Sequence, residues 1–416
     1  MGHRRQGNPP PVALIRCRQG IPIPTVPTSL KQGLLLFWVK EWGLIQGFEE
    51  KRLLGWVCSY TPEEIILTLG LTPCRLSGTD ENQAADDYLP ANFCPFARAC
   101  LNEVLGMSGI SLAGVVLTTS CQGLLHLYNA LGYFSRKREE RFFVYLLDLP
   151  RWGSVKRAAA LQEFASSLRL FTEELRRYFG TEWSNALYLE NLARLRQVRF
   201  LLRELYRFLR EHPGRVRAAG VLELVRAAGR LPKEELIPLL LSAVRCLEGE
   251  IPVPSGSRAA GLLEKLRPRK PCAGPRLLLV GSPPPLSYVD LLEELGGAVV
   301  GDDFCQGYRY CLPEIEEGPD AFLSLARGYL ERVPCPRMLA GQERFVYLSR
   351  LVKEWQVQGI IYHALKFCDS SLYEYTLLRD FFSREGIPVL YLETDYRSGG
   401  LEQARTRLQA FLEVTG

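Results

Sequence analysis

Three cysteines with similar local settings carry the strongest chemical signal in this chain of 416 residues. Cys121 and Cys368 each end an apolar run of strand length and precede a helical pattern, and Cys94 precedes Pro95, which opens a third helical pattern. Parallel sheets place ligands outside the carboxyl ends of their strands. A helix N-terminus stabilises a nearby thiolate by about 0.3–1 kcal/mol. We expect all three at sites where a strand gives way to a helix. These settings predict that Cys94, Cys121 and Cys368 hold an anionic metal cluster between two α/β lobes.

The remaining cysteines are less distinctive. Twelve cysteines in a long chain with α/β patterning indicate reduced thiols or metal ligands rather than disulfides. The paired CxxC spacing of structural zinc sites is absent from the sequence, which disfavours zinc. Cys305, Cys311 and Cys335 form a second candidate group of metal ligands, although Cys311 and Cys335 lie in proline-flanked sequence where a thiol can simply pack.

Composition excludes several classes of protein. The hydrophobic fraction of 47% and the charged fraction of 23% describe a globular protein. A net charge of +5 is too small to indicate nucleic-acid binding. No apolar run approaches the roughly 18 residues that a membrane span needs, and the basic, proline-rich opening has no signal-peptide core. We therefore expect a cytoplasmic protein that binds neither membrane nor nucleic acid.

The chain length predicts more than one domain. Residues 1–32 form a predicted disordered basic, proline-rich tail. An N-terminal α/β domain is predicted over residues 33–152, beginning with an apolar helix. Helical periodicity predicts a helical domain over 153–262, and strand–helix alternation predicts a C-terminal α/β domain over 263–416. Such alternation requires parallel crossovers and a doubly wound sheet in each α/β domain.

Several motifs, in order and spacing, resemble the subunit family of 2-hydroxyacyl-CoA dehydratases and benzoyl-CoA reductases. In the first half these are GWVCSYTPEEII, LPANFCPFARAC and TTSC. In the second half they are GSPPPL, VVGDDFCQGYRY, KFCDSS and GIPVLYLETDYRSGGLEQARTRLQAFLE. The resemblance covers about residues 33–416, and the last 150 residues or so carry most of its specificity.

The resemblance implies two flavodoxin-like parallel-sheet domains flanking a helical domain. It also implies a [4Fe–4S] cluster on Cys94, Cys121 and Cys368, with one iron open to substrate. A separate ATP-hydrolysing iron–sulfur activator would supply one low-potential electron, and the substrate would be a CoA thioester. The active form would be a homodimer or a heterodimer with a related subunit.

Two alternatives stay open at this stage. A related branch of the family holds a double-cubane [8Fe–9S] cluster on six cysteines and reduces small molecules, and here Cys305, Cys311 and Cys335 would supply the second trio. The other alternative is a non-catalytic electron-transfer or structural subunit.

A few further residues are candidates for proton transfer or for local structure. Cys58 lies where dehydratases tend to carry a small hydroxyl residue, so it is a candidate proton relay. Glu64 is a candidate acid–base group, although Glu63 and Glu64 at a helix start also suit capping. Asp302 and Asp303 would repel an anionic cluster, so we expect them to cap a turn or to pair with Arg309.

Overall fold

The computed structural model describes most of the chain after residue 51. The described residues are 52–78, 83–106, 112–137, 141–151, 157–250, 261, 264–267, 274–338, 342–395 and 400–416. The predicted N-terminal tail, and the apolar helix predicted after it up to residue 51, lie outside them.

The first lobe is a four-stranded parallel sheet in the order β2-β1-β3-β4. Its strands are short and mostly buried, as expected for a parallel sheet covered on both faces. They are β1 (Leu53–Trp56), β2 (Thr72–Arg75), β3 (Leu112–Thr118) and β4 (Phe143–Leu147). The helical segments between them are α2 (Glu63–Thr68), η1 (Ala84–Asp87), α3 (Pro95–Gly106) and α4 (Gln122–Lys137).

The second lobe repeats this architecture with the order β6-β5-β7-β8, again wholly parallel. Its strands are β5 (Arg276–Gly281), β6 (Ala298–Asp302), β7 (Gly359–Leu365) and β8 (Val389–Thr394). Its helices are α10 (Leu286–Glu294), α12 (Gln342–Glu354), α13 (Asp369–Arg384) and α14 (Leu401–Thr415). The segment between β6 and α12 adds η3 (Tyr308–Cys311), α11 (Ala321–Leu330) and η4 (Pro336–Met338). The predicted pair of flavodoxin-like sheets is confirmed, because each lobe shows the 2-1-3-4 strand order of that fold.

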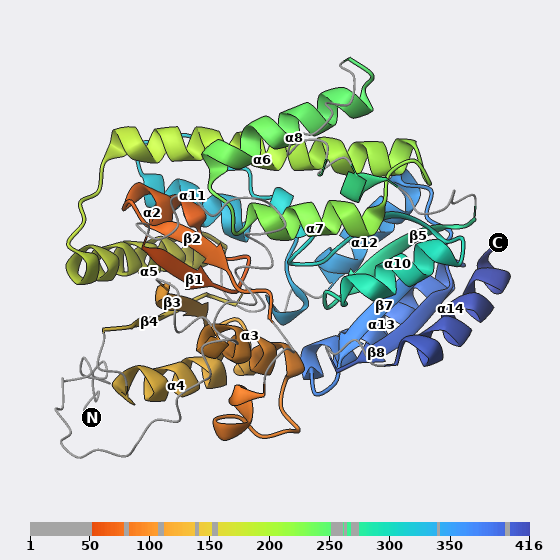
Figure 1. Ribbon diagram of the computed structural model, residues 1–416, viewed down its shortest axis with the longest axis horizontal. Helices are drawn as coiled ribbons and strands as arrows, with labels where there is room; N and C mark the ends of the chain where they lie inside the picture. The colour runs from red at the N-terminus through yellow and green to blue at the C-terminus, as the bar shows by residue number, and fades with distance from the viewer. Residues whose placement is uncertain are drawn as a thin grey trace, which may run out of the picture.

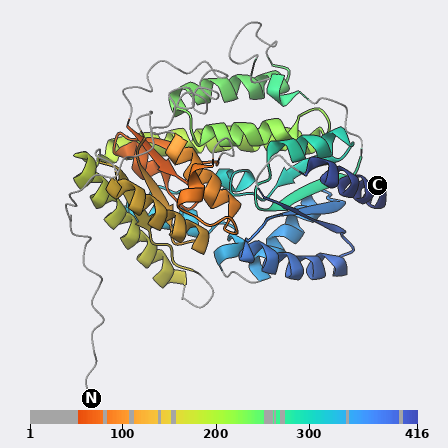
Figure 2. The ribbon, with the colours of Figure 1, turned by 60° about the horizontal axis from the view of Figure 1, so that its bottom comes forward.

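A layer of helices joins the two lobes (Figures 1 and 2). It comprises α6 (Asn185–Glu211), α7 (Ala218–Ala228) and α8 (Lys233–Leu247). Helix α5 (Arg157–Phe179) instead packs against β4 of the first lobe. Helix α6 packs on α2 of the first lobe and on β6 of the second, so one helix spans both. Helix α11, which the sequence did not predict, leaves the second lobe and packs against α5. Within the described residues, no helix is long and apolar enough to cross a membrane.

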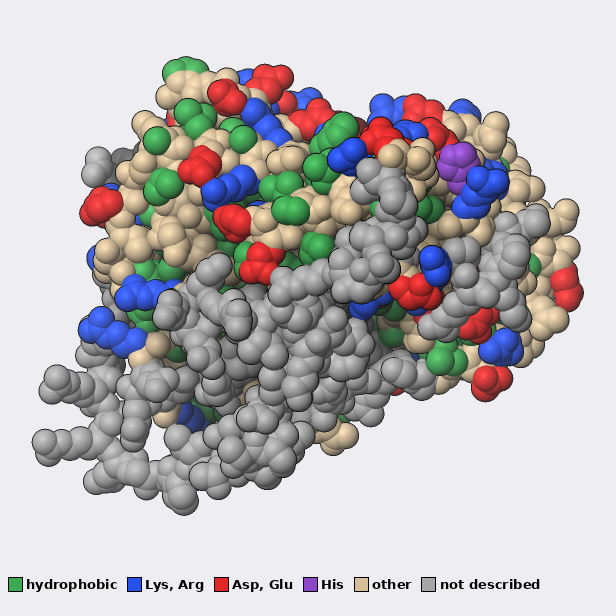
Figure 3. Space-filling model, turned by 45° about the horizontal axis from the view of Figure 1, so that its top comes forward, with side chains coloured by type: hydrophobic (Ala, Val, Ile, Leu, Met, Phe, Trp, Pro, Cys, Tyr) green, Lys and Arg blue, Asp and Glu red, His purple; other side chains and the backbone are tan. Residues whose placement is uncertain are grey.

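One face of the molecule is mixed in charge. In the face drawn in Figure 3, the described Lys and Arg side chains alternate with Asp and Glu rather than gathering by sign. This distribution agrees with the small net charge of +5.

The start of α2 is fixed by buried ion pairs that cross between layers. The Glu64 carboxylate is fully buried, pairs with the Arg199 guanidinium of α6 at 2.8 Å, and accepts a hydrogen bond from the Tyr329 hydroxyl of α11 at 2.8 Å. Glu63 pairs with the buried Lys233 ammonium of α8 at 2.9 Å. These two acids therefore join the first lobe to the helical layer.

We predict that Glu64→Ala lowers the free energy of unfolding by about 3–5 kcal/mol, because it leaves the Arg199 guanidinium buried without its counter-charge. The double variant Glu64→Leu with Arg199→Met removes both charges and should recover much of the loss. Denaturant titration checks both. A Glu64→Ala chain as stable as the parent would show that the pair contributes nothing.

A cavity lined by cysteines between the two lobes

The carboxyl ends of both sheets meet at one cavity. Its walls come from the segments that follow β1, β3, β5, β6 and β7, together with the starts of α3 and α4 and the segment before η4. Five thiols line it: Cys58, Cys94, Cys121, Cys305 and Cys335. A sixth thiol, Cys368, lies behind the cavity wall. The Arg337 side chain lines the cavity and donates a hydrogen bond to the Cys368 sulfur at 3.0 Å.

Cys94, Cys121 and Cys368, the first trio, share one local geometry. Each lies directly before the first residue of a helix, α3, α4 or α13 respectively. The Cys94 and Cys121 sulfurs also accept a hydrogen bond from the backbone N–H three residues later in the chain. The Cys368 side chain makes no such cap bond, and its sulfur instead lies 3.2 Å from the Ser371 hydroxyl. All three sulfurs lie at a helix start, where unpaired backbone N–H groups favour negative charge.

The expected strand before each cysteine of the first trio is present in two of three cases. Strands β3 and β7 end three residues before Cys121 and Cys368. Cys94 instead follows turns and η1, so the prediction of a strand end there was wrong. Its position comes from α3, because Pro95 fixes the helix start.

The first helical turn of α4 leaves open space between two of these sulfurs. A Cβ atom added at Gly123 would lie 3.7 Å from both the Cys94 sulfur and the Cys121 sulfur. The two sulfurs thus face a common space that glycine keeps clear.

Cys58, Cys305 and Cys335 form a second trio beside the first. Cys58 lies two residues after β1, Cys305 lies three residues after β6, and Cys335 directly precedes η4. Burial raises the pKa of the Cys305 thiol, and the nearby Cys335 and Cys58 thiols raise it further, while Arg75 opposes them. All three residues line the same cavity.

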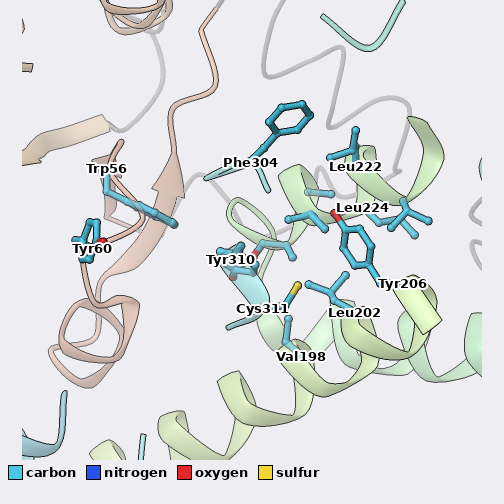
Figure 4. Packing of buried hydrophobic residues seen from close by; sticks show 14 of the residues in the cluster. Trp56, Tyr60, Val198, Leu202, Tyr206, Leu222, Leu224, Phe304, Tyr310 and Cys311 are labelled. Carbon is cyan, nitrogen blue, oxygen red and sulfur yellow. Dashed lines mark hydrogen bonds between the residues drawn. The ribbon is translucent and has the colours of Figure 1, made fainter. Parts of the chain in front are cut away.

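Cys311 is not part of this group, contrary to the prediction. Figure 4 shows its sulfur among Val198 and Leu202 of α6 and beside Tyr310. It is fully buried in the hydrophobic core, and burial raises its pKa well above the ordinary value. Cys58, which the sequence suggested only as a proton relay, takes its place, because it follows β1 in the way that Cys121 follows β3.

The Arg337 guanidinium connects the two trios. One nitrogen lies 3.0 Å from the Cys368 sulfur, and the other lies 3.8 Å from the Cys335 sulfur. Burial raises the pKa of each of these thiols, but Arg337 and Ser371 together outweigh burial at Cys368, and Arg337 and Arg309 together outweigh it at Cys335. The pKa of each thiol therefore falls below its ordinary value.

Three arginines around the second trio have no carboxylate partner among the residues that the structure describes. Arg75 is fully buried, and Arg332 and Arg337 are partly buried. Arg332 donates only to the carbonyls of Ser59, Arg309 and Tyr329 and to the Ser59 hydroxyl. A buried cation is costly unless an anion compensates it, so these side chains indicate an anionic occupant of the cavity.

The acidic residues near the cavity are already paired. Asp303 binds the Arg309 guanidinium through both oxygens, at 2.7 and 2.8 Å, and also pairs with Arg344. Asp302 accepts hydrogen bonds from the backbone N–H groups of Phe304 and Tyr308. Glu64 does not line the cavity and belongs to the network with Arg199, so the acid–base role predicted for it there was wrong.

This set of donors fits an iron–sulfur cluster. Thiolates are the ligands that such clusters prefer, and uncompensated arginines suit the negative charge of a thiolate-bound cluster. No three described His, Cys, Asp or Glu side chains lie close enough to share one metal ion. A cubane does not need three side chains around one metal ion, because each of its cysteines binds a different iron atom.

Known proteins resemble this chain over most of its length. The family model described as 2-hydroxyglutaryl-CoA dehydratase, D-component matches residues 58–415. The (R)-phenyllactyl-CoA dehydratase beta subunit of Clostridium sporogenes is 26% identical over 369 residues, which cover 88% of this chain and 92% of that protein. The putative dehydratase subunit YjiM of Escherichia coli is 26% identical over 376 residues, covering 87% and 91%.

A reductase shows the same extent of similarity. One of the benzoyl-CoA reductase subunits of Thauera aromatica is 21% identical over 372 residues, covering 87% of this chain and 90% of that protein. The matches run through both lobes and the helical layer, in agreement with the resemblance seen in the motifs. The chain therefore belongs to the 2-hydroxyglutaryl-CoA dehydratase D-component family, which includes subunits of 2-hydroxyacyl-CoA dehydratases and of benzoyl-CoA reductase.

Proposed function

We propose that this chain is the cluster-binding subunit of an iron–sulfur reductase or dehydratase that is activated by one-electron transfer. The convergence of six cysteines, Cys58, Cys94, Cys121, Cys305, Cys335 and Cys368, on one cavity carries the proposal. The arginines without carboxylate partners in the described residues support it, because a cluster ligated by thiolates supplies the negative charge that they lack.

The six cysteines favour a double-cubane [8Fe–9S] cluster over a single [4Fe–4S] cluster. A single cubane with an open iron needs only the first trio, which leaves three further thiols at the same cavity without a function. Cys311, which the sequence placed in the second group, lies in the hydrophobic core and not at the cavity. Cys58, Cys305 and Cys335 line the cavity instead. We therefore rank small-molecule reduction at a double cubane first.

The second candidate function is dehydration or reduction of a CoA thioester at a single cubane on Cys94, Cys121 and Cys368. The names of the relatives favour it, since they are subunits of acyl-CoA dehydratases and of benzoyl-CoA reductase. Those names also describe subunits, so a partner chain is part of this proposal. In this case Cys58 would act as a proton relay beside the open iron rather than as a ligand.

The protein supplies position, charge and exclusion of water in either case. A bound cluster would supply low-potential electron transfer. Backbone N–H groups at two helix starts hold the Cys94 and Cys121 sulfurs, and the Ser371 hydroxyl and Arg337 hold the Cys368 sulfur. Arg337 contacts both the Cys335 and the Cys368 sulfurs, so it holds one cysteine of each trio in a fixed position relative to the other.

Iron content distinguishes the two candidates. We predict about eight irons in each anaerobically reconstituted chain, and Cys305→Ser should lose about half of them because it removes a ligand of the second trio. Cys311→Ser is the matched control, six residues away in the hydrophobic core, and should keep its iron. About four irons in the parent, unchanged in Cys305→Ser, would instead establish the single cubane.

The space at Gly123 provides an independent test. Gly123→Val should lower the iron content, because the added methyl groups would enter the space between the Cys94 and Cys121 sulfurs. Gly132→Val lies in the same helix, where an added Cβ meets nothing nearer than the Arg136 side chain at 3.8 Å, and it should retain iron. Equal iron content in both variants would show that the cluster lies elsewhere.

Turnover should require ATP and a separate activator. The sequence contains no GxxxxGK[ST] phosphate loop, so the chain must import its low-potential electron from a nucleotide-hydrolysing partner. Anaerobic assays with dithionite alone, and with dithionite, ATP and activator, should differ by at least about tenfold. They should be run with an acyl-CoA panel and with small reducible molecules such as acetylene. Equal rates with and without activator would refute this part of the proposal.

A further inference from the structure

Arg75 is a buried cation whose hydrogen-bonding capacity is largely unused. It ends β2, is only 1% exposed, and stacks on the Trp56 ring at 4.6 Å. One terminal nitrogen donates to the Cys305 carbonyl at 2.7 Å. The Nε and Nη1 atoms find no hydrogen-bond partner among the described residues.

The surroundings of Arg75 direct its charge toward Cys305. The only hydrogen bond that the Arg75 side chain donates among the described residues goes to the Cys305 carbonyl. Gln306, which follows Cys305, is also buried, and neither atom of its side-chain amide has a partner among the described residues. Buried polar atoms that have no hydrogen-bond partner among the described residues therefore lie next to Cys305.

We propose that Arg75 is the counter-charge for the cluster half held by Cys58, Cys305 and Cys335, and that it raises the reduction potential of that half. This inference rests on the proposed double cubane. Arg75 acts as a positioning residue, because it contacts the peptide of a ligand rather than the cluster itself.

The direction of the effect follows from electrostatics. Reduction adds one negative charge to a cluster, and a fixed cation nearby stabilises the reduced form more than the oxidised form. The effect is large where water is excluded, since the effective dielectric constant is low. No carboxylate among the described residues pairs with Arg75 to cancel this charge. The two halves of the site would therefore differ in potential, with the half next to Arg75 reduced more easily.

The test is an anaerobic redox titration followed by EPR, with iron content measured on the same full-length samples. Arg75→Met should keep the shape of the side-chain stem and remove its charge. At a fixed potential, it should lower the ratio of reduced to oxidised cluster in one half by at least about tenfold, a shift of about 59 mV for a one-electron couple. Arg75→Lys retains the charge and should recover most of the shift.

Arg276→Met is the matched control. Arg276 begins β5 and also has no carboxylate partner in the described part of the chain, but it lies at the opposite end of its sheet and donates to the Trp355 and Arg210 carbonyls. Its removal should leave the potentials unchanged.

The remaining outcomes each support or overturn the inference. If Arg75→Met loses about half of its iron while Arg75→Lys keeps it, the counter-charge is needed to hold that half, which also supports the inference. Full iron with unchanged potentials in Arg75→Met, or equal iron loss in the Met and Lys variants, would overturn it. The iron content of the parent chain is measured before any Arg75 variant is made. About four irons in the parent would refute the double cubane itself.

Discussion

The structure depends on one constraint. Buried guanidinium groups lie beside thiols, and too few carboxylates are present among the described residues to pair with them. Arg75, Arg332 and Arg337 surround cysteines rather than acids among the described residues. Neutral thiols do not compensate buried cations, so the protein alone holds these side chains at a cost in free energy. That cost is understandable if a thiolate-bound anionic group completes the site, because the same arginines then become favourable.

The fold supplies this arrangement through a repeated device. Both lobes use the 2-1-3-4 strand order, and the carboxyl ends of the two sheets face one cavity. Helix α6 and the buried pair of Glu64 with Arg199 connect the layers. Cysteines on different lobes can stay within reach of one occupant only if the lobes keep a fixed separation, and these buried contacts provide that.

The architecture and the first trio could be predicted from the sequence, because both depend on local pattern. Apolar runs of strand length predict parallel strands, and a cysteine directly before a helix is visible without coordinates. The second trio depends on tertiary position. Cys335 and Cys311 both lie in proline-flanked sequence, yet one reaches the cavity and the other packs against Leu202 of α6. Cys305 and Cys335 were predicted as candidates, whereas Cys58 was missed as a ligand although it follows β1 much as Cys121 follows β3.

Other misses have the same cause. Glu64 has the sequence position of a capping or catalytic acid, but its partners Arg199 and Tyr329 lie more than a hundred residues away. No periodicity reveals such pairs. The prediction for Asp303 was more successful, because its partner Arg309 lies only six residues later and the pairing is nearly local.

The six cysteines of the cavity are spread from position 58 to position 368, which has a consequence for biosynthesis. The last of them follows β7, late in the chain, so a ribosome-bound chain lacks a complete set until most of the protein has been made. Contacts between such distant segments also form slowly. An inorganic group delivered during synthesis would meet only part of its ligands. If the proposed cluster binds here, the chain would therefore fold first, on the strength of its helical layer and its buried ion pairs, and take up the cluster afterwards.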